Sequence, residues 1–429
     1  MKESKDIDQT LNHLFRHESG KMVSVLVKIF GTENFEMAED VVQDALVSAL
    51  ETWKFRGIPD NPRAWLYRTA RNKAIDVIRK NKHNQAIDFS DPAKQLLTSE
   101  YTLTATMNNY WEENQIQDDF LAMMYASCDP KISEENQITF ILKSLCGFST
   151  KEVARSFLTS EETISKRLYR TKEYFRKNKI KPTIPSDEEI ESRTHTVLNS
   201  IYLLFNEGYS ATHSKELVRE DLISQALHLC NSLLGNKKTN TSEAKALMAL
   251  MCFHTARSKS RLSSKGELVQ LSKQDRSTWN KELIQAGRWY LHRAGLGSTY
   301  SNYHIEAAIA FQHCDAPTYE ETNWGAILAY YDMLLSISND PIVALNRCLV
   351  ILELNGPKLA LNAITELENI EVLKNYYLYH ASLGAIKERM KENVQAVSHY
   401  KKAIDLTQSV QEQKFLQERI TSILFKYGP

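Results

Sequence analysis

Two short segments of the 429-residue chain combine basic and aromatic side chains at spacings that suit nucleic acid. The first, PRAWLYRTARNKAIDVIRK, spans Pro62–Lys80 and repeats arginines along one side of an expected helix, close to Trp65 and Tyr67. Aromatic rings stack on unpaired bases while guanidinium groups hold the phosphate backbone. The second, GFSTKEVARSFLTSEETISKRLYRTKEYFRK, spans Gly147–Lys177 and predicts two helices joined by a tight turn. Both segments therefore point to contacts with nucleic acid.

The second segment has the features of a helix-turn-helix, in which the second helix enters the major groove. Ser149 and Glu152 have capping-box spacing, and Thr159 or Ser160 can cap the second helix. Residues near the start of that helix would reach base edges, while later basic residues would hold phosphates. A helical hairpin with a basic face also occurs without DNA binding, and this turn lacks the usual glycine. The side chains expected to face inward are Val153, Ala154, Phe157, Ile164, Leu168 and Phe175.

The sequence offers no candidate for catalysis. It contains no carboxylate pair, nucleophile constellation, phosphate-binding loop or metal-ligand spacing, so we expect no enzyme, no metal and no cofactor. Its six cysteines are scattered and never form CxxC, which is typical of reduced thiols in a cytoplasmic protein. No signal peptide is visible and the best apolar stretch is too short to span a bilayer, so no membrane contact is expected.

The net charge of zero hides a strong local asymmetry. Residues 33–53 carry six acids and no Lys or Arg, whereas residues 54–82 carry nine basic residues and two acids. Residues 83–135 are again acidic, with ten acids against two lysines, and residues 166–181 have eight basic residues against one acid. Solvated helix faces produce charge runs of this kind, but two dense basic blocks beside acidic ones favour a DNA-binding protein with a second, basic partner.

Few Gly and Pro residues and recurrent helical periodicity predict an all-α fold. Residues 38–53 form an expected amphipathic helix with an apolar stripe of Ala38, Val41, Val42, Ala45, Leu46, Ala49 and Trp53. Asn61 is expected to cap the next helix, which begins at Pro62. Pro182 and Pro185 cannot continue a helix and mark a break between the two halves of the chain.

The C-terminal part contains one good repeat signal. Leu383, Gly384, Ala396, Tyr400 and Ala403 have the spacing of a tetratricopeptide (TPR) helix pair, in which small residues let two helices approach closely. A degenerate copy precedes it, with Ala360, Ile364 and Leu367 in the matching frame. An unrelated helical bundle is an open alternative for residues 188–300.

These motifs occur in an order that resembles extracytoplasmic-function (ECF) sigma factors of the sigma-70 type. Region 2 of that family is similar to AEDVVQD at Ala38–Asp44, FRG at Phe55–Gly57 and AWLYRTARN at Ala64–Asn72, and region 4 is similar to the helix pair. The extension resembles the subgroup with a long TPR-like C-terminal part, on the segments Ile201–Tyr209, Gln274–Trp279 and Pro341–Arg347.

The resemblance implies an all-α chain of five parts. These are a region 2 bundle at 1–82, an acidic flexible linker at 83–117, a region 4 helix-turn-helix at 118–182, a helical extension at 188–300, and TPR-like repeats at 301–429. The linker would thread toward the nucleic-acid channel of the polymerase. The implied partners are promoter DNA and core RNA polymerase, through its β′ clamp helices and its β flap, with a regulatory protein expected at the extension.

The resemblance also implies roles for individual residues. The surface that binds the β′ clamp helices would be Asp40, Gln43, Asp44 and Val47. The contacts to the −10 element would come from Phe55, Arg56, Asn61, Trp65, Tyr67, Arg68, Arg71, Asn72 and Lys73. The contacts to the −35 element would come from Ser165, Lys166, Arg167, Tyr169 and Arg170. Ser165 stands where relatives often carry a basic residue, which leaves the preferred −35 sequence open.

Two other functions stay open on the residues alone. A helix-turn-helix regulator with a TPR-like sensor domain would bind an operator as a dimer, and a TPR-type scaffold would not bind DNA. Neither explains an acidic helix followed by an aromatic and basic one in residues 33–82. We therefore expect a sigma factor that recruits core polymerase, recognises −35 and −10 DNA, and is regulated by its own extension.

Overall fold

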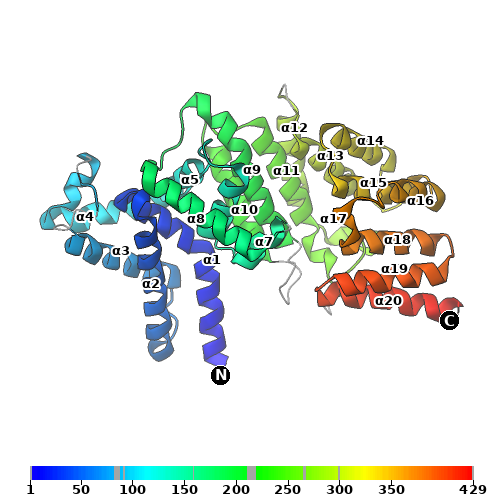
Figure 1. Ribbon diagram of the computed structural model, residues 1–429, viewed down its shortest axis with the longest axis horizontal. Coiled ribbons are helices and arrows are strands. Elements are labelled where there is room, and N and C mark those ends of the chain that lie inside the picture. Colours follow the sequence, from blue (N-terminus) through cyan, green and yellow to red (C-terminus); the bar gives the residue numbers. More distant parts are fainter. Residues whose placement is uncertain are drawn as a thin grey trace. The chain divides into compact units, whose positions relative to one another are not determined.

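Helices form the regular structure of the chain in the computed structural model (Figure 1), so the expected all-α fold class is confirmed. The structure describes residues 2–81, 87–89, 92–157, 159–209, 219–263, 267–297 and 300–427. They divide into two compact units, Met1–Leu204 and Phe205–Pro429, with the boundary inside helix α9. The five-part division implied by the sequence is finer than this and stays a prediction. None of the described helices is long and apolar enough to cross a membrane.

The first unit consists of helices and short helical turns. In chain order they are α1 (Lys2–Phe30), η1 (Thr32–Asn34), α2 (Phe35–Arg56), α3 (Pro62–Asn81), η2 (Pro92–Leu97), α4 (Glu100–Tyr110), α5 (Glu113–Ser127), α6 (Glu134–Phe140), the π-helical turn η3 (Ile141–Leu145), α7 (Thr150–Ser156), α8 (Glu161–Asn178) and α9 (Asp187–Tyr209).

The local features expected for α2 and α3 are present. Six of the seven residues in the apolar stripe of α2 are buried, and the seventh, Leu46, is half-buried. At the start of α3 the side chain of Asn61 accepts a hydrogen bond of 3.0 Å from the backbone N–H of Ala64, and Pro62 is the first helical residue. Trp65 packs edge-on against Trp53, which joins the two helices through an aromatic contact.

The predicted linker contains more helix than its sequence suggests. Its described part includes η2 and α4, and α4 packs against α3 through Leu103 and Met107, which are fully buried. Two apolar residues four apart in an otherwise polar segment give only a weak helical pattern. Helix α4 contacts its neighbours η2 and α5 and also α3, which lies further away in the sequence.

Helices α5 to α8 pack directly on α1 and α2 within the first unit. Gly20 of α1 lies so close to the backbone of Leu145 that a Cβ at position 20 would meet the carbonyl oxygen at 1.9 Å. The rings of Phe35, Phe140 and Phe175 form a continuous cluster, with centroid distances of 5.0 and 4.9 Å. The two segments expected to read DNA are therefore parts of one packed body.

The second unit continues with helices to the C-terminus. They are α10 (Glu220–Gly235), α11 (Ser242–Ala256), η4 (Ser258–Arg261), η5 (Leu271–Lys273), η6 (Arg276–Thr278), α12 (Lys281–Ala294), α13 (Asn302–Asp315), α14 (Trp324–Ile337), α15 (Pro341–Leu354), α16 (Pro357–Thr365), α17 (Glu371–Lys374), α18 (Tyr377–Arg389), α19 (Asn393–Leu406) and α20 (Val410–Tyr427).

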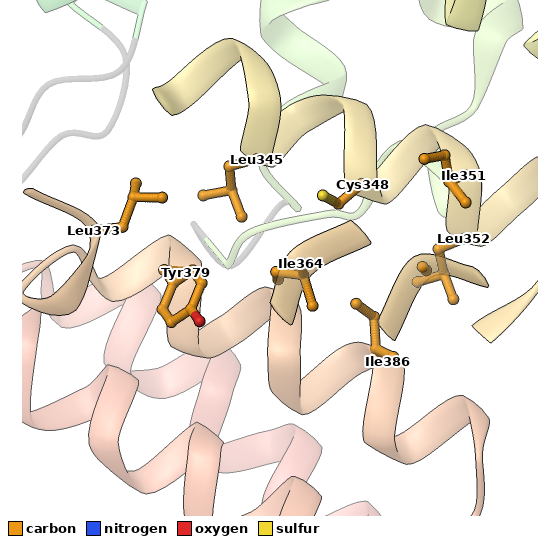
Figure 2. Close-up of a cluster of buried hydrophobic side chains, with 9 residues drawn as sticks. Leu345, Cys348, Ile351, Leu352, Ile364, Leu373, Tyr379 and Ile386 are labelled. Carbon is orange, nitrogen blue, oxygen red and sulfur yellow. The ribbon is translucent and has the colours of Figure 1, made fainter. Parts of the chain in front are cut away.

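Successive helix pairs build the end of the second unit. Helices α18, α19 and α20 lie side by side (Figure 1), and Gly384 of α18 touches the ring of Tyr400 on α19 so closely that a Cβ there would lie 2.6 Å from it. Ala396 and Ala403 are fully buried in the same contact. Figure 2 shows the apolar cluster that joins α15, α16 and α18. Ala360 and Ile364 of α16 are both buried members of this cluster. The residues of the predicted repeat thus lie where two helices meet.

Candidate polymerase and nucleic-acid interface

One face of α2 is acidic, and no other part of the described residues covers it. Asp40, Gln43 and Asp44 are exposed there, and Val47 exposes 52% of its surface as an aliphatic residue among them. The opposite face of α2 carries the buried stripe, so the four side chains are held outward by the packing of the helix. An acidic surface with one exposed aliphatic residue suits a basic partner with an apolar contact point.

An exposed aromatic residue marks the end of α2. Phe55 exposes 90% of its surface, and Arg56 beside it is also exposed. Helix α2 continues through Arg56, so both residues belong to its last turn. In the sequence they precede the start of α3 by a few residues, and Asn61 serves as the cap of that helix. A bare ring beside a guanidinium group is a suitable surface for stacking on an unpaired base.

Helix α3 divides the expected −10 residues into two rows. Trp65, Arg68 and Asn72 follow one another at helical spacing, and Arg68 and Asn72 are exposed. Neither Arg68 nor Asn72 has an ion-pair or hydrogen-bonding partner in the part of the chain that the structure describes. Lys73 is half-buried at the flank of this row, and the indole of Trp65 is half-buried against Trp53. We call Trp65, Arg68 and Asn72 the open row.

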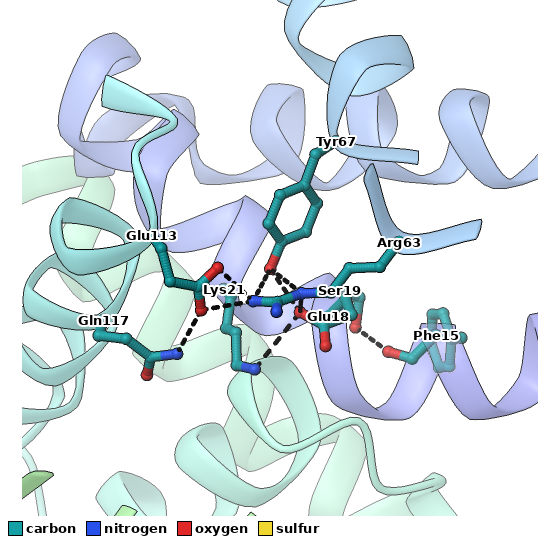
Figure 3. A network of polar contacts seen from close by, with 8 residues as sticks. All are labelled: Phe15, Glu18, Ser19, Lys21, Arg63, Tyr67, Glu113 and Gln117. Carbon is teal, nitrogen blue, oxygen red and sulfur yellow. Dashed lines mark hydrogen bonds and ion pairs between the residues drawn. The ribbon is translucent and has the colours of Figure 1, made fainter. Parts of the chain in front are cut away.

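Tyr67 and Arg71 lie with Arg63 in a second row that other parts of the unit cover. Figure 3 shows Arg63 donating to the carboxylate of Glu113 at 2.7 and 2.9 Å, while the hydroxyl of Tyr67 donates to Glu18. Arg71 donates to the side-chain oxygen of Asn108 on α4 at 2.6 Å. We call Arg63, Tyr67 and Arg71 the covered row.

Burial and neighbouring charges together shift the pKa values of Tyr67 and Arg63 in the covered row and of Glu113. Burial, and then the Glu18 carboxylate, raise the pKa of Tyr67 well above its ordinary value, so its hydroxyl stays protonated. Burial alone would lower the pKa of Arg63, but the Tyr67 hydroxyl and Glu113 outweigh it and raise that pKa. The pKa of Glu113 would rise with burial, yet Arg63 holds it below its ordinary value. The row is therefore a network of charge-assisted hydrogen bonds.

The predicted caps of the second helix pair are confirmed. The backbone N–H of Ser149 donates to Glu152 at 2.6 Å, and the N–H of Glu152 donates to the Ser149 hydroxyl at 3.2 Å, which completes the capping box. Ser160 rather than Thr159 caps α8, since it accepts from the N–H of Thr163. Of the residues expected to face inward, Phe157 and Leu168 are half-buried and the others are buried.

Four of the five expected −35 residues are exposed on α8. Ser165, Lys166 and Arg170 are exposed, and Tyr169 exposes 67% of its surface. The fifth, Arg167, differs, because its side chain is 15% exposed, pairs with Glu135 of α6 and lies over the ring of Phe157. Arg167 therefore holds α8 to α6 and α7, and the outward face of α8 presents Lys166, Tyr169 and Arg170.

Sequence reasoning missed the residues that cover the second row of α3. Glu18 comes from α1, Asn108 from α4, Trp111 from the turn after it and Glu113 from α5. The acidic composition of residues 83–135 was the one visible signal. It predicted negative charge in this segment but did not show which acidic residues would contact α3. Which residue of α3 each acid meets depends on tertiary packing, which periodicity does not encode.

Two segments of the chain match the models of known protein families. Residues 14–84 match the model of sigma-70 region 2, and residues 193–295 match a family of unknown function (DUF6596). A protein of Rhizobium meliloti (strain 1021), itself described as uncharacterized, is 29% identical over 387 residues, which cover 90% of this chain and 90% of the relative. No solved structure matches the chain.

The region 2 match supports a sigma factor of the sigma-70 type. Proteins of that type bind core RNA polymerase and promoter DNA and are not enzymes. The matched segment, residues 14–84, contains the acidic face of α2, the exposed Phe55 and both rows of α3. The similarity therefore falls on the part of the first unit where exposed acidic, aromatic and basic side chains gather.

Proposed function

We propose that this chain is an ECF-type sigma factor that directs core RNA polymerase to promoters through −10 and −35 DNA. The observation that carries the proposal is the pairing, within residues 14–84, of an uncovered acidic face on α2 with an aromatic and basic surface at the start of α3. A regulator that acts only as a DNA-binding dimer gives no reason for the acidic face. A polymerase subunit must have a surface for each of its two partners.

The acidic face of α2 is the proposed contact with the polymerase. Asp40, Gln43, Asp44 and Val47 would meet the β′ clamp helices, and the second helix pair would meet the β flap. Opposite charges steer such an encounter and fix its register.

The open row of α3 is the proposed first contact with −10 DNA. Phe55 would take an unstacked base, and Arg68 and Asn72 would hold the strand next to it. Tyr67 and Arg71 would contact the DNA only after their hydrogen bonds in the network of Glu18, Asn108 and Glu113 break. Proposed contacts to −35 DNA come from Ser165, Lys166, Tyr169 and Arg170 on α8, whereas Arg167 would support α8 from behind.

The second unit is proposed to regulate the first and to receive a regulatory protein. The chain stays close to neutral there, which disfavours a third DNA-binding surface. We also propose a cytoplasmic location, where core polymerase and promoter DNA occur together.

Co-purification with core polymerase, followed by run-off transcription from a candidate promoter, tests the proposal. Asp44→Arg should raise the dissociation constant for core polymerase by about tenfold or more, because a repulsive pair replaces an attractive one. Glu191→Arg, an equal reversal of charge at an exposed position of α9, is the matched control and should bind normally. If both variants bind polymerase equally well, the acidic face of α2 is not the contact with polymerase. A chain that never co-purifies with polymerase would favour the operator-binding regulator.

A further inference from the structure

Three arginines gather in the second unit where α11 ends. Arg257 follows the last residue of α11, Arg261 ends η4 and Arg276 begins η6. Each is half-buried, and Arg257 lies close enough to both of the others to repel them. We call these three residues the arginine cluster.

The hydrogen bonds of Arg261 and Arg276 go to neutral groups. Arg276 donates to the backbone oxygens of His313 and Ala316 at 2.8 and 2.6 Å and to the Thr322 hydroxyl at 3.2 Å. Arg261 donates to the backbone oxygen of Tyr209 and lies 4.0 Å above the ring of that residue. Backbone oxygens and ring faces orient a guanidinium group but do not neutralise its charge.

Arg257 has one buried donor without a partner, although the Tyr209 side chain bonds to it and raises its pKa. Its Nη1 is buried without a hydrogen-bonding partner, and its Nη2 lies 3.4 Å from Nδ1 of His254. The Nδ1 of His313, on the neighbouring helix α13, is also buried and has no partner. Buried polar atoms without partners are rare in folded proteins, and a missing water or ion is one of the usual reasons.

Within the described residues, the three positive charges have no paired carboxylate. No carboxylate lies within ion-pair distance of Arg257, Arg261 or Arg276 among the residues that the structure describes, and Glu412 and Glu320 act on the cluster only from further away. Burial lowers the pKa of His313 to about 3 and that of His254 well below its ordinary value, so both rings are neutral and act as hydrogen-bonding groups. A half-buried positive cluster without a counter-ion is costly.

We propose that the arginine cluster binds a small anion that carries a carboxylate or a phosphoryl group. A water molecule could satisfy Nη1 of Arg257, but it would bring no charge. Guanidinium groups match the oxygens of carboxylates and phosphates in geometry as well as in charge. Each arginine keeps part of its surface exposed, which leaves an approach for the anion from solvent. Anion binding at the arginine cluster does not depend on the role of the first unit in transcription.

Calorimetric titration of the full chain at constant ionic strength tests the site, with sodium phosphate and sodium citrate as the two probes and chloride as the background ion. We expect saturable binding of at least one probe, and the probe that saturates at the lower concentration identifies the phosphoryl or the carboxylate class. Arg257→Met and Arg261→Met should each weaken binding by about tenfold or more, since each removes a charge-assisted hydrogen bond. Arg288→Met should bind within about twofold of the unchanged chain, because Arg288 lies on the exposed side of α12 and pairs with Asp315.

Thermal unfolding of the same proteins separates binding from a structural role. In chloride alone Arg257→Met should be at least as stable as the unchanged chain, because it removes an uncompensated charge, and the probe should then raise the unfolding temperature of the unchanged chain only. Absence of saturable binding, or an affinity in Arg257→Met and Arg261→Met equal to that of the unchanged chain, would overturn the site. So would an Arg257→Met chain that unfolds far below the unchanged chain in chloride, while Arg261→Met binds normally.

Discussion

The ammonium group of Lys172 on α8 lies 2.6 Å from the carboxylate of Glu39 on α2, and each side chain is only 25% exposed. The pair connects the helix proposed to read −35 DNA with the helix proposed to bind polymerase. Lys172 also lies over the ring of Phe35, within the aromatic cluster that continues to Phe140 and Phe175. The ion pair therefore sits at the edge of an apolar contact, where it is partly shielded from water.

A charge swap tests whether this ion pair holds the two parts of the first unit together. Glu39→Lys and Lys172→Glu should each destabilise the chain, because each places like charges in contact, and the double variant should recover most of the loss. We expect a coupling free energy of about 0.5–3 kcal/mol, measured by urea unfolding of all four proteins. If the effects of the two single variants simply add in the double variant, the ion pair does not contribute to the packing.

The network of the covered row should be visible in the stability of the chain. Tyr67→Phe removes a hydroxyl that is bonded to Glu18 and Arg63 and leaves the buried carboxylate of Glu18 with one partner fewer. We expect the free energy of unfolding to fall by about 1–3 kcal/mol. Tyr169→Phe is the matched control at an exposed site of α8 and should change it by less than about 0.5 kcal/mol. Equal effects would mean that the Tyr67 network is not stabilising.

Local features of the fold were accessible to sequence reasoning. The α2 stripe, the Asn61 cap and the capping box of Ser149 and Glu152 each involve residues within a few positions of one another. Periodicity and capping preference depend on such short separations, which is why they predicted these elements.

The division of α3 into an open and a covered row was not accessible in the same way. Tyr67 and Glu18 are 49 positions apart, Arg63 and Glu113 are 50 apart, and Arg71 and Asn108 are 37 apart. No local pattern specifies which of several acids approaches which arginine. The pairing of Arg167 with Glu135, which lies 32 positions away, was inaccessible for the same reason, because it is set by the packing of α6 on α8.

Uncovering the second row of α3 should increase DNA binding by the free chain. Asn108→Ala combined with Trp111→Ala removes the partner of Arg71 and the ring that packs on Tyr67. If the proposed function is right, affinity for a single-stranded −10 oligonucleotide should rise severalfold, as judged by fluorescence anisotropy at fixed salt concentration. Adding Arg71→Ala should abolish the gain, and Tyr101→Ala, on the outer side of α4 with 94% of its surface exposed, should leave binding unchanged. A gain that survives Arg71→Ala would show that the covered row is not involved.

The contact between α1 and α7 should weaken in acid. Glu152 pairs with Arg16 at 2.9 Å; burial would raise the pKa of Glu152, but the Ser149 backbone and Arg16 outweigh it and hold that pKa below its ordinary value. A carboxyl group with a lowered pKa stabilises the fold above its unfolded pKa, and this stability is lost as the pH falls through the lowered value. Glu152→Gln should therefore unfold more readily than the unchanged chain at pH 7, by about 1 kcal/mol, and the difference should vanish as the pH falls through the lowered pKa of Glu152. Arg16→Met should show the same pH profile, and a difference that stays constant with pH would rule out the pair as its cause.

The proposed regulation by the second unit can be tested by truncating the chain. The contacts of α9 with α5 indicate the residue after which the chain should be truncated. A cut after Pro185 follows the proline break, yet it removes the start of α9, where the hydroxyl of Thr194 lies 2.9 Å from that of Tyr125 and both are buried. Arg193 also donates to the backbone oxygen of Tyr125. Residues 1–204 should therefore fold cooperatively, whereas residues 1–185 should lose several kcal/mol, because a buried face of α5 becomes exposed. Circular dichroism during heating compares the two fragments, and run-off transcription with the 1–204 fragment then measures the regulation itself. Activity and promoter choice identical to those of the full chain would contradict regulation by the second unit, while equal stability of both fragments would contradict the role given to α9.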